Sequence, residues 1–134
     1  MGQPRVILLD SHVALWLALE PQKISPIAAR EIQLARLAGG MAISAITLAE
    51  LATSYSKRRF TLTVPLDVFL DETESRFAIL PITARIAARS VTFPASFPRD
   101  PADRIITATA LVDGLPLVSA DRAIRRARLV RTIW

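Results

Sequence analysis

The chain has 134 residues, of which 51% are apolar and 22% are charged, so it is long enough for one folded domain and too apolar for a disordered one. It has no cysteine, which excludes disulfides, thiol nucleophiles and cysteine-bound metal sites. Seventeen Lys and Arg against twelve Asp and Glu give a net charge of +5 and a pI of about 11.0. A basic domain suits nucleic acid as a substrate or partner, and an acidic protein partner would match the charge equally well.

No apolar run approaches the roughly 20 residues that a membrane-spanning helix needs. The run that ends at Asp10 lacks the length and the cleavage pattern of a secretion signal. We therefore expect a cytoplasmic protein with no membrane partner, folded as a single domain over residues 1–134.

The first third of the chain predicts a strand followed by two helices. Residues 6–9 form a continuous apolar run, typical of a strand buried on both faces, and residues 11–19 fit a helix. A second helix is expected between the cap at Ser25 and the glycine pair at 39–40.

The middle of the chain repeats this alternation. Residues 41–44 predict the second strand, and Thr47 is expected to cap the helix after it. A basic connection over residues 57–65 leads to a helix over 66–75 and a third strand over 77–80.

The last third predicts the remaining strands. A helix is expected after a cap at Thr83, and another that Pro101 opens and Gly114 ends. Residues 117–118 are the expected fourth strand, and residues 129–130 a fifth strand at an edge. This alternation indicates an α/β fold with a central, mainly parallel sheet of four to five strands.

Four acidic residues are candidate ligands at the expected carboxyl ends of the strands, where open α/β sheets bind ligands: three lie close to that edge, and Asp103 lies in the first turn of the helix that leads into the fourth strand. They are Asp10, Glu50, Asp103 and Asp121. Asp10 directly follows the first strand, where a carboxylate has no evident capping role. Carboxylates held together repel one another unless a divalent cation neutralises them, and their hard oxygens match Mg²⁺ or Mn²⁺.

Three of these acids also have an interpretation as part of a helix N-terminus. Glu50 fits a capping box with Thr47, and Asp121 lies where the N-cap of the next helix is expected. Asp100 holds the same place before Pro101, so Asp103 can be an acid favoured by the helix dipole. For a single acid, capping is the simpler interpretation; the joint placement of all four favours a metal site.

Four short motifs resemble, in order and spacing, those of PIN domains. They are the runs at residues 7–12, 43–50, 99–108 and 117–121. The resemblance covers essentially the whole chain and extends to the VapC toxins of bacterial toxin–antitoxin pairs. It implies a three-layer α/β/α PIN-like fold, one or two bound Mg²⁺ or Mn²⁺ ions, and endonucleolytic cleavage of RNA. It also implies a cognate antitoxin as partner, and a homodimer.

Carried over by position, the resemblance makes the four acids metal ligands, with Ser11 and Ser119 as polar supports. Asp100 is ambiguous, being adjacent to the third motif acid and suited to capping. A chain with these features is expected to be a metal-dependent endoribonuclease. The alternative is a non-catalytic RNA- or protein-binding module of PIN-like fold, in which the acids only cap helices.

The positive charge has two interpretations as well. Arg104 and Arg122 each follow a candidate metal ligand directly, which favours contact with RNA. The clusters at residues 57–59 and 122–131 are either an RNA backbone track, a docking surface for an acidic partner, or solvated helix faces. His12 is the chain's single histidine, so a ribonuclease mechanism that needs a histidine pair is excluded.

Overall fold

Five parallel strands form one sheet, in the order β3-β2-β1-β4-β5, in the computed structural model, which describes residues 6–134. The strands are β1 (Val6–Leu9), β2 (Gly40–Ser44), β3 (Ala78–Leu80), β4 (Leu117–Val118) and β5 (Thr132–Ile133). The sequence prediction of four to five mainly parallel strands is confirmed. Residues 1–5, which include the start of the segment considered as a secretion signal, lie outside the described part.

Seven α-helices and one short 3-10 helix connect these strands in the described chain. They are α1 (Ser11–Leu19), η1 (Pro21–Lys23), α2 (Pro26–Ala38), α3 (Ala45–Ser56), α4 (Leu66–Arg76), α5 (Ala84–Ser90), α6 (Pro101–Asp113) and α7 (Arg122–Ala127). In residues 6–134, no helix combines the length and the apolar character that a bilayer crossing requires.

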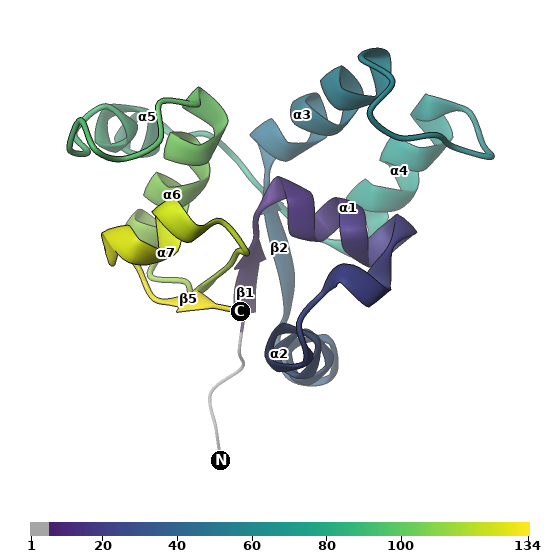
Figure 1. Cartoon of the computed structure of the whole chain (residues 1–134), viewed down its shortest axis with the longest axis horizontal. Coiled ribbons are helices and arrows are strands. Elements are labelled where there is room, and N and C mark those ends of the chain that lie inside the picture. Colours follow the sequence, from purple (N-terminus) through teal and green to yellow (C-terminus); the bar gives the residue numbers. More distant parts are fainter. Residues whose placement is uncertain (1–5) are drawn as a thin grey trace.

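The helices cover both faces of the sheet, because side chains along each strand point alternately to opposite faces. Ile7 and Leu9 of β1 pack against α1 and α2, whereas Leu8 packs toward α5, α6 and α7. Figure 1 shows α1 and α2 on one side of the sheet and α5, α6 and α7 on the other. The result is the three-layer α/β/α architecture that the sequence predicted. Strand β1, buried on both faces, lies at its centre.

Several predicted helix ends are confirmed by their capping groups. The side chains of Ser25 and Thr83 accept hydrogen bonds from the backbone N–H groups of Ala28 and Ile86. Gly114 ends α6 in the left-handed conformation, with φ at 67°, which glycine adopts without steric cost.

The predicted fifth strand at residues 129–130 was wrong. The strand that pairs with β4 is Thr132–Ile133, and it does lie at the sheet edge. Leu129 and Val130 are apolar because they pack on the core beneath α6 and α7, in the turn that follows the left-handed Arg128. These two residues are therefore apolar because they pack against the core, and not because they form a strand.

Thr47 was wrongly predicted as the cap of the helix after β2. That helix begins at Ala45, and Ser44, the last residue of β2, is its N-cap, with its hydroxyl accepting from the Ile46 N–H at 3.2 Å. Strand and helix follow each other with no loop between them. Thr47 is a buried residue within the first turn of α3, and its hydroxyl is available for another contact.

Candidate active site

The predicted site acids meet in one hollow of about 300 Å³, called the acidic hollow below. It lies at the carboxyl ends of β1 and β4, where the connections from neighbouring strands run in opposite directions and an open α/β sheet leaves a crevice. Its lining residues are Asp10, Ser11, His12, Trp16, Glu50, Asp100, Asp103, Ala120 and Asp121.

Asp10 is the most deeply placed of these acids, with 6% of its surface exposed. Its backbone N–H donates to the carbonyl of Val118 at 3.1 Å, which ties the end of β1 to β4. Its Oδ1 accepts from the Val13 N–H at 2.9 Å, so Asp10 is the N-cap of α1. The expectation that Asp10 has no capping role was wrong. The cap uses only one of the two carboxylate oxygens, so capping and ion binding are compatible.

Glu50 is held from α1 by a short chain of hydroxyl groups. The Ser11 hydroxyl donates to Glu50 Oε1 at 2.6 Å, and the Thr47 hydroxyl lies 2.9 Å from the Ser11 oxygen. Because the single Ser11 proton points to the carboxylate, Thr47 donates to Ser11. Glu50 therefore does not form the predicted capping box with Thr47. Ser11 thus contacts Glu50, as expected for a polar support, and Thr47 contacts Ser11 from its other side.

Asp103 lies on the first turn of α6, and Asp100 is the N-cap of the same helix. Asp100 Oδ1 accepts from the Ala102 N–H at 2.9 Å, which confirms the capping interpretation. Asp100 also lines the acidic hollow and raises the pKa of both Glu50 and Asp103. It is therefore a cap that belongs electrostatically to the acidic group.

Asp121 completes the group from the N-terminus of α7, opposite α6. Its Oδ1 accepts from the Ile124 N–H at 3.0 Å, and its own N–H donates to the Ser119 hydroxyl oxygen at 3.1 Å. Ser119 is fully buried and also hydrogen-bonds the Asp10 carboxylate. One buried hydroxyl thus connects the acids that follow β1 and β4.

Burial raises the pKa of three of these carboxyl groups. Desolvation is the main cause for Asp10, partly offset by hydrogen bonds from Ser119 and Val13. It is also the main cause for Glu50, partly offset by the bond from Ser11. Burial, together with the charges of the neighbouring acids, raises the pKa of Asp103 to about 7. Without a cation, the hollow therefore disfavours full ionisation of its acids near neutral pH.

The donor set of the hollow fits a hard divalent cation. It consists of carboxylate and hydroxyl oxygens, and burial together with the neighbouring acids disfavours the charged form of Asp10, Glu50 and Asp103. In the described chain no three His, Asp or Glu side chains already surround one point closely enough to hold an ion. Mg²⁺ keeps several water ligands and takes about one or two protein carboxylates, so it suits acids that line a hollow without closing around it.

One further polar group near the acids lacks a partner. Thr107 lies four residues after Asp103 on α6, and its fully buried hydroxyl has no hydrogen-bond partner among the described residues. A buried hydroxyl usually has a protein or water partner. Thr107 is not among the residues that line the acidic hollow.

The arginines expected to contact RNA are placed differently from each other. The Arg104 guanidinium donates to the carbonyls of Pro98 at 2.8 Å and Phe97 at 3.2 Å, so it holds the loop before α6. Arg122 is exposed at the first position of α7. Contact of either residue with RNA stays a prediction.

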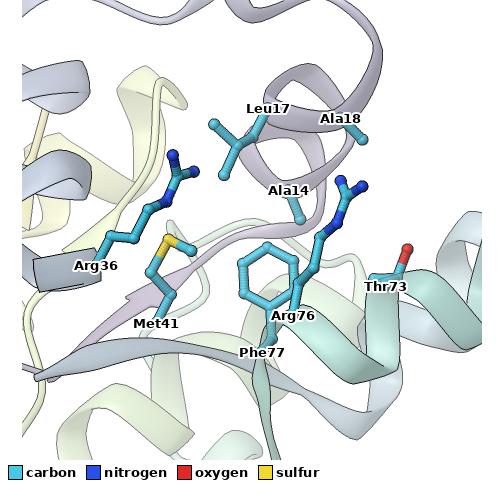
Figure 2. Close-up of a pocket in the computed structure, with 8 residues that line it drawn as sticks. All are labelled: Ala14, Leu17, Ala18, Arg36, Met41, Thr73, Arg76 and Phe77. Atoms are coloured by element: carbon cyan, nitrogen blue, oxygen red, sulfur yellow. The ribbon is translucent and has the colours of Figure 1, made fainter.

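A second hollow, called the arginine pocket below, lies on the other side of α1. It has a volume of about 400 Å³ between α1, α2, β2 and α4. Figure 2 shows the Arg36 and Arg76 guanidinium groups on either side of it, with Met41 beside Arg36 and Phe77 beside Arg76. No carboxylate lines it, which makes it unsuited to a metal cation.

Sequence analysis missed Thr47 as part of the site, and left open whether Asp100 belongs to the site or only caps a helix. Thr47 precedes Glu50 by three residues, so the two share a helix face; that spacing was assigned to a capping box instead. The deciding fact is the helix start at Ala45, which moves Thr47 from the cap into the first turn.

Comparisons with known proteins agree with this fold. The PIN domain family matches residues 7–129. A ribonuclease of Mycobacterium tuberculosis, VapC22, is 41% identical over 130 residues, covering 96% of this chain and 98% of that protein.

Solved structures of toxin–antitoxin complexes share the fold. A chain of the DNA-bound VapBC complex from Salmonella typhimurium superposes with a TM-score of 0.71 at 20% identity, over 97% of both chains. A chain of VapBC-1 from nontypeable Haemophilus influenzae superposes with a TM-score of 0.69 at 18% identity, over 95% of this chain and 96% of that one.

Proposed function

We propose that this chain, which belongs to the PIN-domain family, is a metal-dependent endoribonuclease and the toxin component of a VapBC-type toxin–antitoxin pair. The proposed ligands of the metal, direct or through water, are Asp10, Glu50, Asp103 and Asp121. Ser11 and Ser119 hold the acids in place. The 41% identity to a ribonuclease over nearly the whole chain supports the activity.

The observation that carries the proposal is the convergence of the acids in one hollow, where the pKa values of Asp10, Glu50 and Asp103 are raised. An assembly of helix caps alone gives no reason to place like charges close together, because each cap is satisfied on its own helix. Glu50 and Asp103 are not N-caps, yet they face the same hollow as the three that are. Such an arrangement is stabilised when a divalent cation binds to it.

The residues of the hollow supply position and proton exchange. Asp10 is fixed at the base by Val13 and Ser119, and Glu50 is fixed by Ser11. Asp103, whose pKa is about 7, can hold a proton near neutral pH and release it when positive charge enters the hollow. A bound Mg²⁺ or Mn²⁺ would supply activation of water and stabilisation of the leaving oxygen in phosphodiester hydrolysis.

The proposed products are a 5′-phosphate and a 3′-hydroxyl, because water is the attacking group. Attack by the ribose 2′-hydroxyl needs an acid–base pair, usually of histidines, and His12 is the one histidine of the chain. The product ends are therefore a test of the reaction class that does not depend on the RNA sequence.

The proposal includes RNA as substrate, a cognate antitoxin, a homodimer and a cytoplasmic location for a single domain of residues 1–134. The net charge of +5 supports the RNA substrate. The likeness to chains of VapBC complexes supports the antitoxin.

The test is cleavage of a structured RNA by the purified protein with Mg²⁺ or Mn²⁺, with EDTA, and with Asp10→Asn. Cleavage should need the metal, leave 5′-phosphates and be lost in Asp10→Asn. Asparagine caps helices about as well as aspartate, so α1 should keep its start in this variant. Equal cleavage by parent and Asp10→Asn, once contaminating nucleases are excluded, would disprove the assignment.

The alternative, a non-catalytic RNA- or protein-binding module, is favoured by one observation: Asp10, Asp100 and Asp121 are indeed helix caps. Binding of Mn²⁺ separates the two functions. If the acids only cap helices, the parent and Asp103→Asn should bind Mn²⁺ with the same affinity, because Asp103 is not a cap. The nuclease should lose most of its Mn²⁺ affinity in Asp103→Asn.

A further inference from the structure

The acidic hollow continues into a third hollow of about 270 Å³, called the side groove below, which both polar and apolar residues line. The two share Ser11, His12, Trp16, Glu50 and Asp100, so they form one continuous surface. Away from the acids, the side groove runs between α1 and the segment after α3, and reaches Arg59 and Phe60. Figure 1 shows this segment leaving the outer end of α3 toward α4.

Most charged residues of the side groove either form an ion pair or are acids that also line the acidic hollow. Lys23 forms an ion pair with Glu20 at 3.0 Å and lies over the Trp16 ring at 5.9 Å. Arg59 is exposed, and in residues 6–134 its guanidinium has neither an ion-pair partner nor an aromatic ring beneath it. Arg59 is thus the cation of the groove that is free to bind an anion.

The backbone of Arg59 is fixed on both sides. Arg58 ends α3 in the left-handed conformation with φ at 58°, and the N–H groups of Arg58 and Arg59 donate to the carbonyls of Tyr55 and Ser54 at 2.9 and 3.0 Å. This is the hydrogen-bond pattern of a Schellman helix end, with arginine where glycine is usual. The Phe60 ring, 6.0 Å from the ring of buried Phe69, anchors the following residue.

We infer that the side groove binds the RNA strand beside the scissile phosphate, and that Arg59 contacts a phosphate flanking the cleavage site. This inference rests on the proposed nuclease function. Its first support is charge: a guanidinium matches phosphate geometry and is placed at the far end of a surface that starts at the acids. Its second support is the fixed backbone at Arg58 and Arg59, which leaves little loop ordering to oppose binding.

The positions of the basic residues show which of them can contact RNA bound in the side groove. Arg104 donates to carbonyls of its own loop, and Arg122 lines neither the acidic hollow nor the side groove. Lys57 and Arg58 belong to the same sequence cluster as Arg59 and also line neither hollow. Of this cluster, Arg59 alone is placed to follow a strand leaving the acids.

The experiment compares Arg59→Gln with Arg58→Gln, which removes the same charge one residue away. Affinity is measured for a fluorescein-labelled ten-nucleotide single-stranded RNA in Mg²⁺, on an Asp10→Asn background that prevents cleavage. Arg59→Gln should weaken binding about tenfold, the effect of one lost contact with a charged group. It should also reduce the slope of log affinity against log salt by about 0.7, and Arg58→Gln should change both much less.

Cleavage by the otherwise unaltered enzyme adds a second readout. Arg59→Gln should raise KM for the ten-nucleotide RNA, and its effect on a dinucleotide should be much smaller. A dinucleotide has only the scissile phosphate, so it offers Arg59 no partner. The binding measurement needs no cleavage, so a failure of the nuclease proposal is distinguishable from a failure of this one.

Three results would overturn the inference. Equal weakening by Arg59→Gln and Arg58→Gln would show a general charge effect. Equal loss of dinucleotide cleavage would show a distorted site. Unchanged RNA affinity with lost affinity for a poly-glutamate peptide would assign the side groove to an acidic protein partner.

Discussion

Helix α1 separates two hollows of opposite chemistry. On one side, Ser11, His12 and Trp16 face the acidic hollow. On the other, Ala14, Leu17 and Ala18 line the arginine pocket, whose charges are cationic. The arginine pocket has the greater volume, about 400 Å³ against about 300 Å³.

The two hollows differ most in how their charged groups are held. In the acidic hollow, Asp10 is fixed by a helix N–H and Glu50 by a hydroxyl from another helix. In the arginine pocket, Arg36 and Arg76 are exposed and have no ion-pair partner among residues 6–134. Groups that must position an ion and water need fixed geometry, so restraint of the polar side chains, and not volume, identifies the site of chemistry.

The largest effect is expected for Asp103→Asn, which removes a carboxylate from the acidic hollow while keeping its shape. Cleavage should fall by at least about 100-fold, since even supports of metal ligands contribute about 10- to 100-fold. The matched variant is Arg76→Gln, which removes a charge from the other side of α1. Initial rates of RNA cleavage should stay within about twofold of the parent, because Arg76 contacts no proposed ligand. A comparable loss in both variants would end the distinction between the two hollows.

A smaller loss, about 10-fold or more, is expected for Ser11→Ala, which removes the hydroxyl that holds Glu50. Mn²⁺ affinity and cleavage should fall together, because a freely rotating Glu50 meets the ion less often. Ser56→Ala is a suitable control, since that hydroxyl bonds only to its own helix. If Ser11→Ala kept full metal affinity, the hydroxyl chain from Thr47 would have no role in positioning.

A third test uses the pH dependence of stability without metal. The pKa of Asp103 is about 7 in the folded protein against 3.8 for an ordinary aspartate, so its protonated form is favoured by folding. The stability it contributes is fully present below pH 3.8 and is lost as the pH rises toward 7. In EDTA, the melting temperature of the parent should therefore fall relative to that of Asp103→Asn between about pH 4 and pH 7. A constant difference across this range would mean that folding does not raise the pKa of Asp103.

The smallest effect on cleavage is expected for Asp100→Ala, which tests whether Asp100 only caps α6 or also takes part in the chemistry. Asp100→Ala should lower the free energy of unfolding by about 1 kcal/mol, because α6 loses its N-cap, and should keep most of the activity. Urea unfolding of parent, Asp100→Ala and Asp100→Asn measures this, with Asn expected to keep the cap. Loss of cleavage in Asp100→Asn with stability intact would move the third ligand from Asp103 to Asp100.

Most of the fold could be predicted from sequence because its elements have strong local patterns. The run at β1 is apolar throughout, and α6 carries a proline at its start and a glycine at its end. β5 (Thr132–Ile133) could not be predicted in this way, because it has no continuous apolar run, unlike the equally short β4 (Leu117–Val118), and the strand was predicted at the apolar pair of residues 129–130 instead. Its pairing depends on β4, and the pattern of residues 129–133 alone does not show which of them pair with that strand.

The site acids could be predicted as a set, but their hydrogen bonds could not. Asp10 was expected to have no capping role because it directly follows an apolar strand; it lies between β1 and α1 and is the N-cap of α1. The same occurs at Ser44, which ends β2 and caps α3. Where a strand passes directly into a helix, the boundary is decided by backbone torsion, which residue types specify only weakly.

The contact between Trp16 and Trp134 gives this protein a built-in optical probe. These are the only two tryptophans of the chain, and their ring centroids are 5.9 Å apart. Trp16 also lines both the acidic hollow and the side groove, whereas Trp134 lines neither. Intrinsic emission is therefore expected to respond to occupation of this surface. Replacement of Trp134 by phenylalanine would leave a single emitter at the site, so binding of Mn²⁺ or RNA can be followed without a label.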